Sequence, residues 1–382
     1  MLKLPQLNIN GKGGLLESLE TIPDPRTRQG NYSLKSLIAC IFLSMVDGCK
    51  FVNEIPGWLR NLHGSQRKRL GFQDRIPDES TIRRVLRSAD SENLNTTLKP
   101  WFEKTGLSEK AIAIDGKRMC GARRSNENPP EMLNIVEHGT GQVLGQEIVE
   151  SPGNERAAAI KWLSNTTLYR CLITADALHT SKEMAELITG KCSSDYLFVI
   201  KANNRELFEI MKTLNMQETR GAPHASTFER GHGREESREI WCSQNLGWHG
   251  NVSNFFPKAK QVATVVRTQK DLASGKKSFE IVYLVTSLSR TDMGPEKMLQ
   301  GNRGHWTVEA KNHYVKDGYL AEDKSRCRAE NLPHNLSILR NVALKILRKI
   351  QLALCTKKGR ETIPEAHRVL KSLGGACRLL SC

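Results

Sequence analysis

The apolar positions of the first part of the chain recur at helical spacing. From residue 1 to about residue 105 the pattern predicts helices, including an apolar one that starts near Leu34. A second helix is predicted within "IPDESTIRRVLRSAD", residues 76–90, where Asp78 or Ser80 is the candidate N-cap. One face of it is apolar and consists of Ile82, Val85 and Leu86. We therefore expect a helical, DNA-contacting N-terminal domain over residues 1–108.

The periodicity changes at residue 111, where strand-like runs begin to alternate with helical ones. The run "AIAID" predicts a strand over 111–115, and "MLNIVEH" and "QVLGQEIVE" predict a hairpin around Gly139. A helix, a strand at 172–174, a helix starting near Ser181, the strand "DYLFVIKAN" and the helix "RELFEIMKTL" follow. This order predicts an α/β core with a mixed sheet and helices on its faces, over residues 109–215.

Residues 216–295 have a different character, which predicts a β-rich insertion. Strand-like runs such as "KQVATVVRT" and "SFEIVYLVTSL" are separated there by glycine-rich and charged turns. We do not expect this insertion to be needed to build the core sheet. Its segment "ERGHGREESRE", residues 229–239, predicts a basic loop that could lie along a phosphate backbone.

Helical spacing returns after the insertion. The segment that starts at "GPEKMLQGNRGHWTVE" places Trp306, Glu309 and His313 on one face of a predicted helix. We expect residues 296–352 to hold this helix and a following one, and residues 353–382 to form a basic C-terminal tail.

The charge of the chain indicates a polyanionic partner. Lys and Arg number 57 against 41 Asp and Glu, which gives a net charge of +16 and a pI near 9.5. Nucleic acid is the leading partner. A membrane is not favoured, since no apolar run approaches ~18 residues and no signal peptide is seen. The ten cysteines include no C-x-x-C pair, which is typical of reduced thiols in a cytoplasmic protein.

Carboxylates at the ends of two predicted strands are the strongest sign of chemistry. Asp115 ends one strand and Asp176 ends another, and a buried carboxylate is costly unless a cation or hydrogen bonds accompany it. The alternative for Asp115 is an ordinary Asp-Gly turn. Glu309 is a third candidate, against the alternative of a solvated acid on a charged helix. The carboxyl ends of neighbouring strands are where open α/β sheets place their sites.

Short motifs in a fixed order give these acids a context. "AIDGK", "TADALHT", "YLFVIKAN", "HGREESR" and "RGHWTVE" occur in the order found in insertion-sequence DDE transposases. The chain resembles most the H-repeat-associated, ISAs-one-type group, and "PDESTIRRVL" resembles the helical domain of that group. The similarity runs from about residue 15 to residue 350. Val308 and Ala310, beside Glu309, depart from the Ile-Glu-Asn that similar proteins tend to have.

The resemblance implies an RNase H-like catalytic core with Asp115, Asp176 and Glu309 as the catalytic and metal-binding residues. It implies two Mg²⁺ ions, replaceable by Mn²⁺, and cleavage and strand transfer at the ends of an insertion sequence. The implied partners are double-stranded transposon-end and target DNA and further copies of the chain, as a homodimer or higher oligomer. The implied location is the bacterial cytoplasm, at the nucleoid.

Basic side chains near these acids are candidates for DNA contacts, each against the alternative of plain surface charge. Trp306 is a candidate for base stacking, against the alternative of a core position. The candidate phosphate contacts are Lys117, Lys201, Arg303, Lys316, the helical Arg83, Arg84 and Arg87, and the insertion's Arg230, Arg234 and Arg238.

Two other functions stay open from the sequence. One is a catalytically silent, transposase-derived DNA-binding protein that uses the N-terminal helices. The other is an RNase H-like, structure-dependent nuclease, because a fold alone does not fix the substrate.

Overall fold

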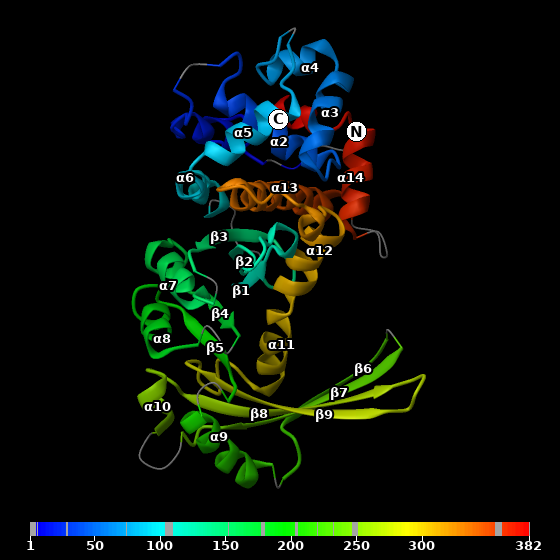
Figure 1. Ribbon diagram of the computed structural model, residues 1–382. Coiled ribbons are helices and arrows are strands. Elements are labelled where there is room, and N and C mark those ends of the chain that lie inside the picture. Colours follow the sequence, from blue (N-terminus) through cyan, green and yellow to red (C-terminus); the bar gives the residue numbers. More distant parts are fainter. Residues whose placement is uncertain are drawn as a thin grey trace. The chain divides into compact units, whose positions relative to one another are not determined.

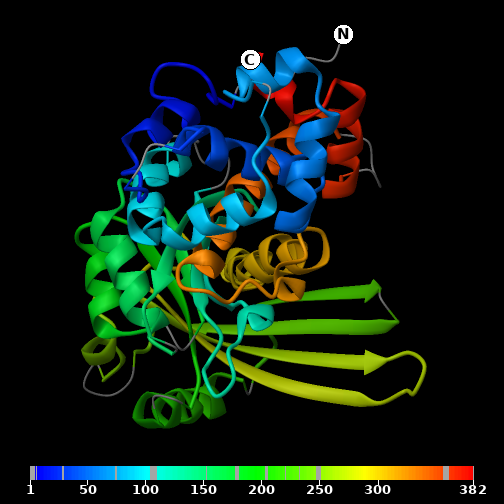
Figure 2. The ribbon, with the colours of Figure 1, turned by 45° about the horizontal axis from the view of Figure 1, so that its top comes forward.

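A computed structural model describes residues 5, 7–27, 30–73, 75–103, 110–151, 153–176, 180–202, 205–219, 221–231, 233–246, 251–355 and 361–381 (Figures 1 and 2). The predicted domain boundary at 108/109 lies outside these residues. The chain divides into two compact units. Unit 1 comprises Met1–Ser108, Gly116–Asn154 and Val308–Cys382, and unit 2 comprises Glu109–Asp115 and Glu155–Thr307.

The N-terminal part of unit 1 is helical, as predicted. Its central helix α2 is buried on nearly every side, and Ser33 caps it by accepting a hydrogen bond from the backbone N–H of Ser36. Asp78 is the N-cap of α5, where its Oδ1 accepts from the N–H of Thr81 at 2.7 Å. The elements are α1 (Leu15–Ser18), η1 (Leu19–Thr21), α2 (Leu34–Val46), η2 (Val52–Glu54), α3 (Ile55–Asn61), α4 (Gly64–Arg69), α5 (Glu79–Ser88) and α6 (Ser91–Glu103).

The rest of unit 1 comes from the middle and the end of the chain. Strands β2 and β3 form the predicted antiparallel hairpin, in which Glu131 pairs with Val149. The long helix α13 packs against α2, α5, α6, α14 and both hairpin strands. The elements are η3 (Cys120–Ala122), β2 (Glu131–Glu137), β3 (Val143–Val149), η5 (Glu309–His313), α12 (Tyr314–Gly318), η6 (Glu322–Lys324), α13 (Leu332–Leu354), α14 (Ile363–Ser372) and η7 (Ala376–Ser381).

One apolar core joins these distant segments. Phe42, Leu86, Val143, Leu339 and Leu370 belong to the same buried cluster. The N-terminal helices therefore share a core with residues beyond 308, and they do not form a unit by themselves. The expectation of a C-terminal tail is wrong, because α14 lies within residues 353–382 and buries its apolar side in this core.

Unit 2 is built on a mixed sheet, so the α/β class predicted from the sequence is confirmed. Within the unit the strand order is β1-β4-β5-β9-β8-β7-β6, with β1, β4 and β5 parallel and the remaining pairs antiparallel. The elements are β1 (Ala111–Arg118, whose last three residues belong to unit 1), α7 (Glu155–Asn165), β4 (Leu172–Ala175), α8 (Lys182–Thr189), β5 (Asp195–Ile200), α9 (Arg205–Glu218), β6 (Ala225–Gly231), β7 (Arg234–Ser243), α10 (Asn251–Phe255), β8 (Gln261–Asp271), β9 (Lys277–Thr286) and α11 (Pro295–His305).

The β-rich insertion continues the core sheet, which corrects the expectation that the sheet does not need it. Strand β9 pairs with β5, with Val199 opposite Leu284 (Figure 1). The pairing satisfies backbone groups along β5 that an exposed strand edge would leave unpaired. The predicted basic loop is wrong in form, because most of its residues belong to the antiparallel strands β6 and β7, in which Gly231 pairs with Arg234. His232 lies outside the described residues.

Helix α11 lies close to this sheet and contacts β4, β5 and β7. A Cβ atom added to Gly301 would lie 3.0 Å from Leu197 Cδ2 and 3.4 Å from Leu172 Cδ2. The glycine therefore permits a close approach of helix and sheet. None of the described helices is long and apolar enough to cross a membrane. The nine described cysteines, from Cys40 to Cys377, form no disulfide bond.

Candidate active site and nucleic-acid interface

Asp115 and Asp176 lie at the same edge of the parallel part of the sheet. The register of β1 and β4 ends with Ile114 opposite Ala175, and each aspartate is the next residue of its strand's path. Both side chains are half-buried. Strand β1 runs on to Arg118, so Asp115 lies within the strand. The predicted strand end at Asp115 is therefore wrong, and so is the alternative of an Asp-Gly turn. The two carboxylates come from adjacent parallel strands, as the sequence predicted.

Lys201 pairs with Asp176. Its Nζ lies 2.9 Å from Oδ1 and 3.3 Å from Oδ2 of the aspartate, and the side chains are 59% and 32% exposed. The Asp176 carboxylate therefore already attracts one cation. Lys201 remains exposed enough to meet a phosphate.

His305 is a residue of this edge that sequence reasoning missed. Its Nδ1 lies 3.1 Å from Thr174 Oγ1, and that hydroxyl also donates to the backbone carbonyl of Ile112 at 3.1 Å. The contact ties the end of α11 to the strand that leads to Asp176. The histidine lies inside the motif "RGHWTVE", but nothing in its spacing indicated a partner on β4.

Glu309 opens a π-helical turn. The predicted single helix is interrupted here: α11 ends at His305, Trp306 is its C-cap, and η5 is a π-helix over Glu309–His313. Single π turns inside α-helices are often found at functional sites. Glu309 is exposed, and Trp306 is 59% exposed, so a core position for this tryptophan is ruled out.

Buried amides fix the π turn within unit 1. Asn341 Nδ2 donates to Asn134 Oδ1 at 2.9 Å and to Gln146 Oε1 at 2.6 Å, and its Oδ1 accepts from Asn312 Nδ2 at 3.3 Å. Asn134 Nδ2 also lies 3.4 Å from His313 Nε2. The three asparagines are fully buried. Such a connected network holds one geometry, because any slip would leave buried polar groups unpaired.

Lys117 is buried against three acids, which corrects its expected contact with phosphate. Its side chain is 6% exposed, and its Nζ lies 2.8 Å from Asp317 Oδ1, 3.6 Å from Asp323 Oδ1 and 3.8 Å from Glu322 Oε2. Burial acts to lower the pKa of Lys117, but these carboxylates outweigh it and the pKa is raised. The ammonium is thus engaged inside unit 1.

Lys316 is also buried, so its expected phosphate contact is corrected for the same reason. Its side chain is 0% exposed; Nζ donates to Ser337 Oγ at 2.9 Å and lies 3.3 Å from Glu322 Oε1. Arg340 lies 3.8 Å from the same carboxylate. Burial lowers the pKa of Lys316 to about 8. We call Lys117, Lys316, Arg340, Asp317, Glu322 and Asp323 the buried ion cluster.

The three arginines of α5 differ in their freedom to bind DNA. Arg83 pairs with Glu79 at 2.5 Å and donates to Cys327 Sγ at 2.9 Å. Arg87 lies 3.6 Å from Glu330. Arg84 is exposed. Arg84 is therefore the residue of this helix best placed to contact a phosphate.

The arginines of the β6–β7 hairpin pair with its acids. Arg230 is 67% exposed and 3.7 Å from Glu235, and Arg234 is 45% exposed and 3.6 Å from Glu236. Arg238 is 14% exposed, forms a short contact with Glu236 and lies 3.9 Å from Glu229.

Glu236 and Arg303 complete this charge pattern. Burial tends to raise the pKa of Glu236, yet the hydrogen bond from Arg267 and the neighbouring arginines lower it. Arg303, 48% exposed on α11, pairs with Glu229. The hairpin is consequently a charge-balanced surface with exposed arginines, and not a purely basic one.

The donor chemistry of the three candidate acids fits a hard divalent cation, which takes oxygen ligands. Asp115 and Asp176 belong to unit 2 and Glu309 belongs to unit 1. Across the residues that the structure describes, no group of three or more His, Cys, Asp or Glu side chains forms a ready metal cluster.

Comparison with known protein families shows which family this chain belongs to. A family model described as "Transposase DDE domain" matches residues 107–345, and one described as "DDE_Tnp_1-associated" matches residues 16–102. The chain belongs to the DDE transposase family. The resemblance seen in the sequence motifs is thereby confirmed.

Relatives of this transposase match along most of the chain. It is 29% identical over 351 residues to "Putative transposase YncI" of Escherichia coli O157:H7, covering 87% of each chain. It is 26% identical over 383 residues to "H repeat-associated putative transposase YhhI" of Escherichia coli K12, covering 95% of this chain and 98% of that one. A solved piggyBac transposase complex with hairpin DNA aligns at TM-score 0.45 and 11% identity over 98% of this chain and 80% of that chain.

Proposed function

We propose that this transposase cleaves DNA at the ends of an insertion sequence and transfers the cut strand, with Asp115, Asp176 and Glu309 as ligands of two Mg²⁺ ions. The observation that carries the proposal is the register of β1 and β4, which sets Asp115 and Asp176 side by side at one sheet edge. The π turn that begins at Glu309 supports it as the third ligand. Mn²⁺ is expected to replace Mg²⁺.

The residues of this chain would hold and orient the reacting groups. When bound, the two ions would activate a water or a 3′ hydroxyl and stabilise the leaving oxygen. Lys201, beside Asp176, offsets part of the repulsion between the carboxylates and can contact the phosphate. The buried amide network around Asn341 keeps the π turn of Glu309 in one geometry.

The DNA partner would meet the exposed cations. Lys201, Arg84, Arg230, Arg234 and Arg303 are the candidates whose exposure supports a phosphate contact. The exposed ring of Trp306 supports its proposed stacking on a base. We propose double-stranded DNA as the substrate and a homodimer or higher oligomer as the assembly on it.

The test of catalysis replaces each acid in turn. Asp115→Ala, Asp176→Ala and Glu309→Ala should each abolish cleavage of transposon-end duplex, while DNA affinity stays within a few-fold. Glu296→Ala is the matched control, because this glutamate is exposed on α11 and lies outside the proposed site. Glu309→Ala with most of its activity retained would remove Glu309 from the site.

The same assay separates the alternatives. A wild-type chain that binds transposon ends but does not cleave them with Mg²⁺ or Mn²⁺ would indicate a silent DNA-binding protein. Faster cleavage of an RNA–DNA hybrid than of transposon-end duplex would indicate a different nuclease.

The role of the insertion is tested with its exposed arginines. Arg230→Ala together with Arg234→Ala should reduce cleavage and leave Mn²⁺ affinity unchanged, because in-line displacement needs the phosphate held in alignment. Arg238 is left in place, since it pairs with the buried Glu236. Lys276→Ala with Lys277→Ala is the control at the other exposed hairpin end. Equal activity of both double variants and the wild type would refute the positioning role.

A further inference from the structure

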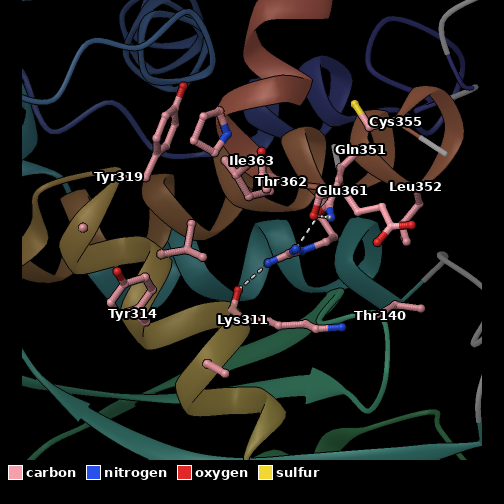
Figure 3. Close-up of a pocket in the computed structure, with 15 residues that line it drawn as sticks. Thr140, Lys311, Tyr314, Tyr319, Gln351, Leu352, Cys355, Glu361, Thr362 and Ile363 are labelled. Carbon is pink, nitrogen blue, oxygen red and sulfur yellow. Dashed lines mark hydrogen bonds between the residues drawn. The ribbon is translucent and has the colours of Figure 1, made fainter. Parts of the chain in front are cut away.

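Unit 1 contains a pocket of about 990 Å³ (Figure 3). It is lined by the π turn and α12 on one side, by the end of α13 and the start of α14 on the other, and by Thr140 of the hairpin turn. The π turn and α12 contribute two adjacent pairs, 310/311 and 314/315, together with Gly318, and Glu309 is not among the lining residues. The pocket is therefore separate from the proposed metal ligand on the same helical segment.

Arg348 is a buried cation in the wall of this pocket. It is 4% exposed; Nη2 donates to the carbonyl of Lys311 at 2.6 Å and Nη1 donates to Gln351 Oε1 at 2.6 Å. Its Nε is buried and has no hydrogen-bond acceptor. Figure 3 shows the bond to Lys311 as a dashed line.

The charge of Arg348 is not balanced by any carboxylate that the structure describes. Within the described part of the chain, no carboxylate lies in ion-pair distance of its guanidinium, whereas Arg340 on the same helix has Glu322 at 3.8 Å. Burial alone lowers the pKa of Arg348 to about 10. A guanidinium stays charged at neutral pH, and a buried charge without a counter-charge is costly. A bound anion would supply the missing charge.

The remaining walls suit a planar, partly apolar group. Tyr314 lines the pocket and is 75% exposed, and Leu352 and Ile363 add apolar surface. Lys311 gives a second positive charge, and Glu361 is the single acid among the described residues of the lining. A volume of this size lies at the upper end of the range for small-molecule sites.

We propose that this pocket binds a single nucleotide unit, with its phosphate on Arg348 and Lys311 and its base against Tyr314. A guanidinium forms strong, charge-assisted hydrogen bonds to phosphate, and a tyrosine ring offers a face for a base. Arg348 lies below the surface, so an intact duplex would not reach it. The nucleotide is a free mononucleotide or an unpaired nucleotide at the end of a DNA strand. This inference does not depend on the proposed metal chemistry.

The test measures binding by the full chain in EDTA, so that failure of catalysis cannot affect the outcome. Calorimetry compares deoxyadenosine monophosphate with deoxyadenosine. Fluorescence anisotropy compares a blunt duplex with the same duplex carrying one unpaired, 5′-phosphorylated nucleotide. We expect at least about tenfold tighter binding of the monophosphate in the first comparison, or of the duplex with the unpaired, phosphorylated nucleotide in the second. The comparison that responds identifies the source of the nucleotide.

The variants place the site. Arg348→Met and Tyr314→Ala should each weaken this binding about tenfold or more, while Arg368→Met should not, because Arg368 is 74% exposed on α14 and lies outside the lining. If Arg348→Met does not fold, binding by the Tyr314→Ala variant tests the proposal, because Tyr314 is exposed and its replacement should not disturb the core. The proposal would be overturned if neither the monophosphate nor the duplex with the unpaired, phosphorylated nucleotide bound more tightly than its partner in the comparison. Unchanged binding by the Tyr314 variant would also overturn it.

Discussion

Glu322→Gln should destabilise unit 1 strongly. The side chain of Glu322 is 1% exposed and faces Lys316 at 3.3 Å, Arg340 at 3.8 Å and Lys117 at 3.8 Å. The neutral amide keeps the volume but leaves these buried cations with only Asp317 and Asp323 as counter-charges. Breaking a buried ion pair by removing one partner costs about 3–5 kcal/mol. At about 2–4 °C per kcal/mol for a unit of this size, the melting temperature should fall by roughly 6–20 °C.

The assay is thermal unfolding followed by circular dichroism, with Glu330→Gln as the matched control. Glu330 also pairs with an arginine of unit 1, at 3.6 Å from Arg87, but both side chains are exposed, at 64% and 50%. Exposed pairs contribute about 0–1 kcal/mol, so this control should change the melting temperature by no more than a few degrees. Equal shifts for the two variants would refute the reasoning from burial.

The difference between wild type and Glu322→Gln should also depend on pH. Burial acts to raise the pKa of Glu322, but Lys316, Arg340 and Lys117 prevail and lower it below the ordinary value of 4.5. A depressed carboxylate pKa gives stability that is present above the unfolded value and is lost as the pH falls through the folded value. The two proteins should therefore differ fully at pH 7 and converge below pH 4.5. A difference that grows toward acid pH would contradict the direction of the shift.

Further outcomes follow from single contacts. Arg84→Ala should reduce the slope of log affinity against log salt concentration for DNA binding by about 0.9. Adding Arg83→Ala and Arg87→Ala should reduce this slope by less than two further units, because both arginines are already paired with acids. An unchanged slope would mean that α5 does not lie on DNA. Asp78→Ala should cost about 1 kcal/mol in a denaturant titration and Asp78→Asn much less, and equal losses would show that the cap does not matter. Gly121→Ala should disrupt the loop at 323–325, since its Cβ would lie 2.3 Å from the carbonyl oxygen of Asp323, and an unchanged melting temperature would contradict this contact.

The sequence by itself determined the strands of the core and the placement of the first two carboxylates after apolar runs. Alternating apolar residues marked β1, β4 and β5, because the burial pattern of a strand is a local property of the chain, although β1 continues three residues beyond Asp115. The N-cap at Asp78 was likewise readable, since a cap involves only the next few residues. The order of the short sequence motifs indicated the DDE transposase family.

The tertiary structure decided which charges are available. Lys117 and Lys316 look like surface cations in the sequence, yet folding places both against Glu322, which is far from Lys117 along the chain. Burial depends on contacts between distant segments, and spacing along one segment does not encode it. The same reason explains why sequence reasoning missed the pairing of β9 with β5 and the packing of α14 in the core of unit 1. It also explains why the sequence did not reveal the burial of Arg348, since this arginine is buried by contacts with other segments of unit 1.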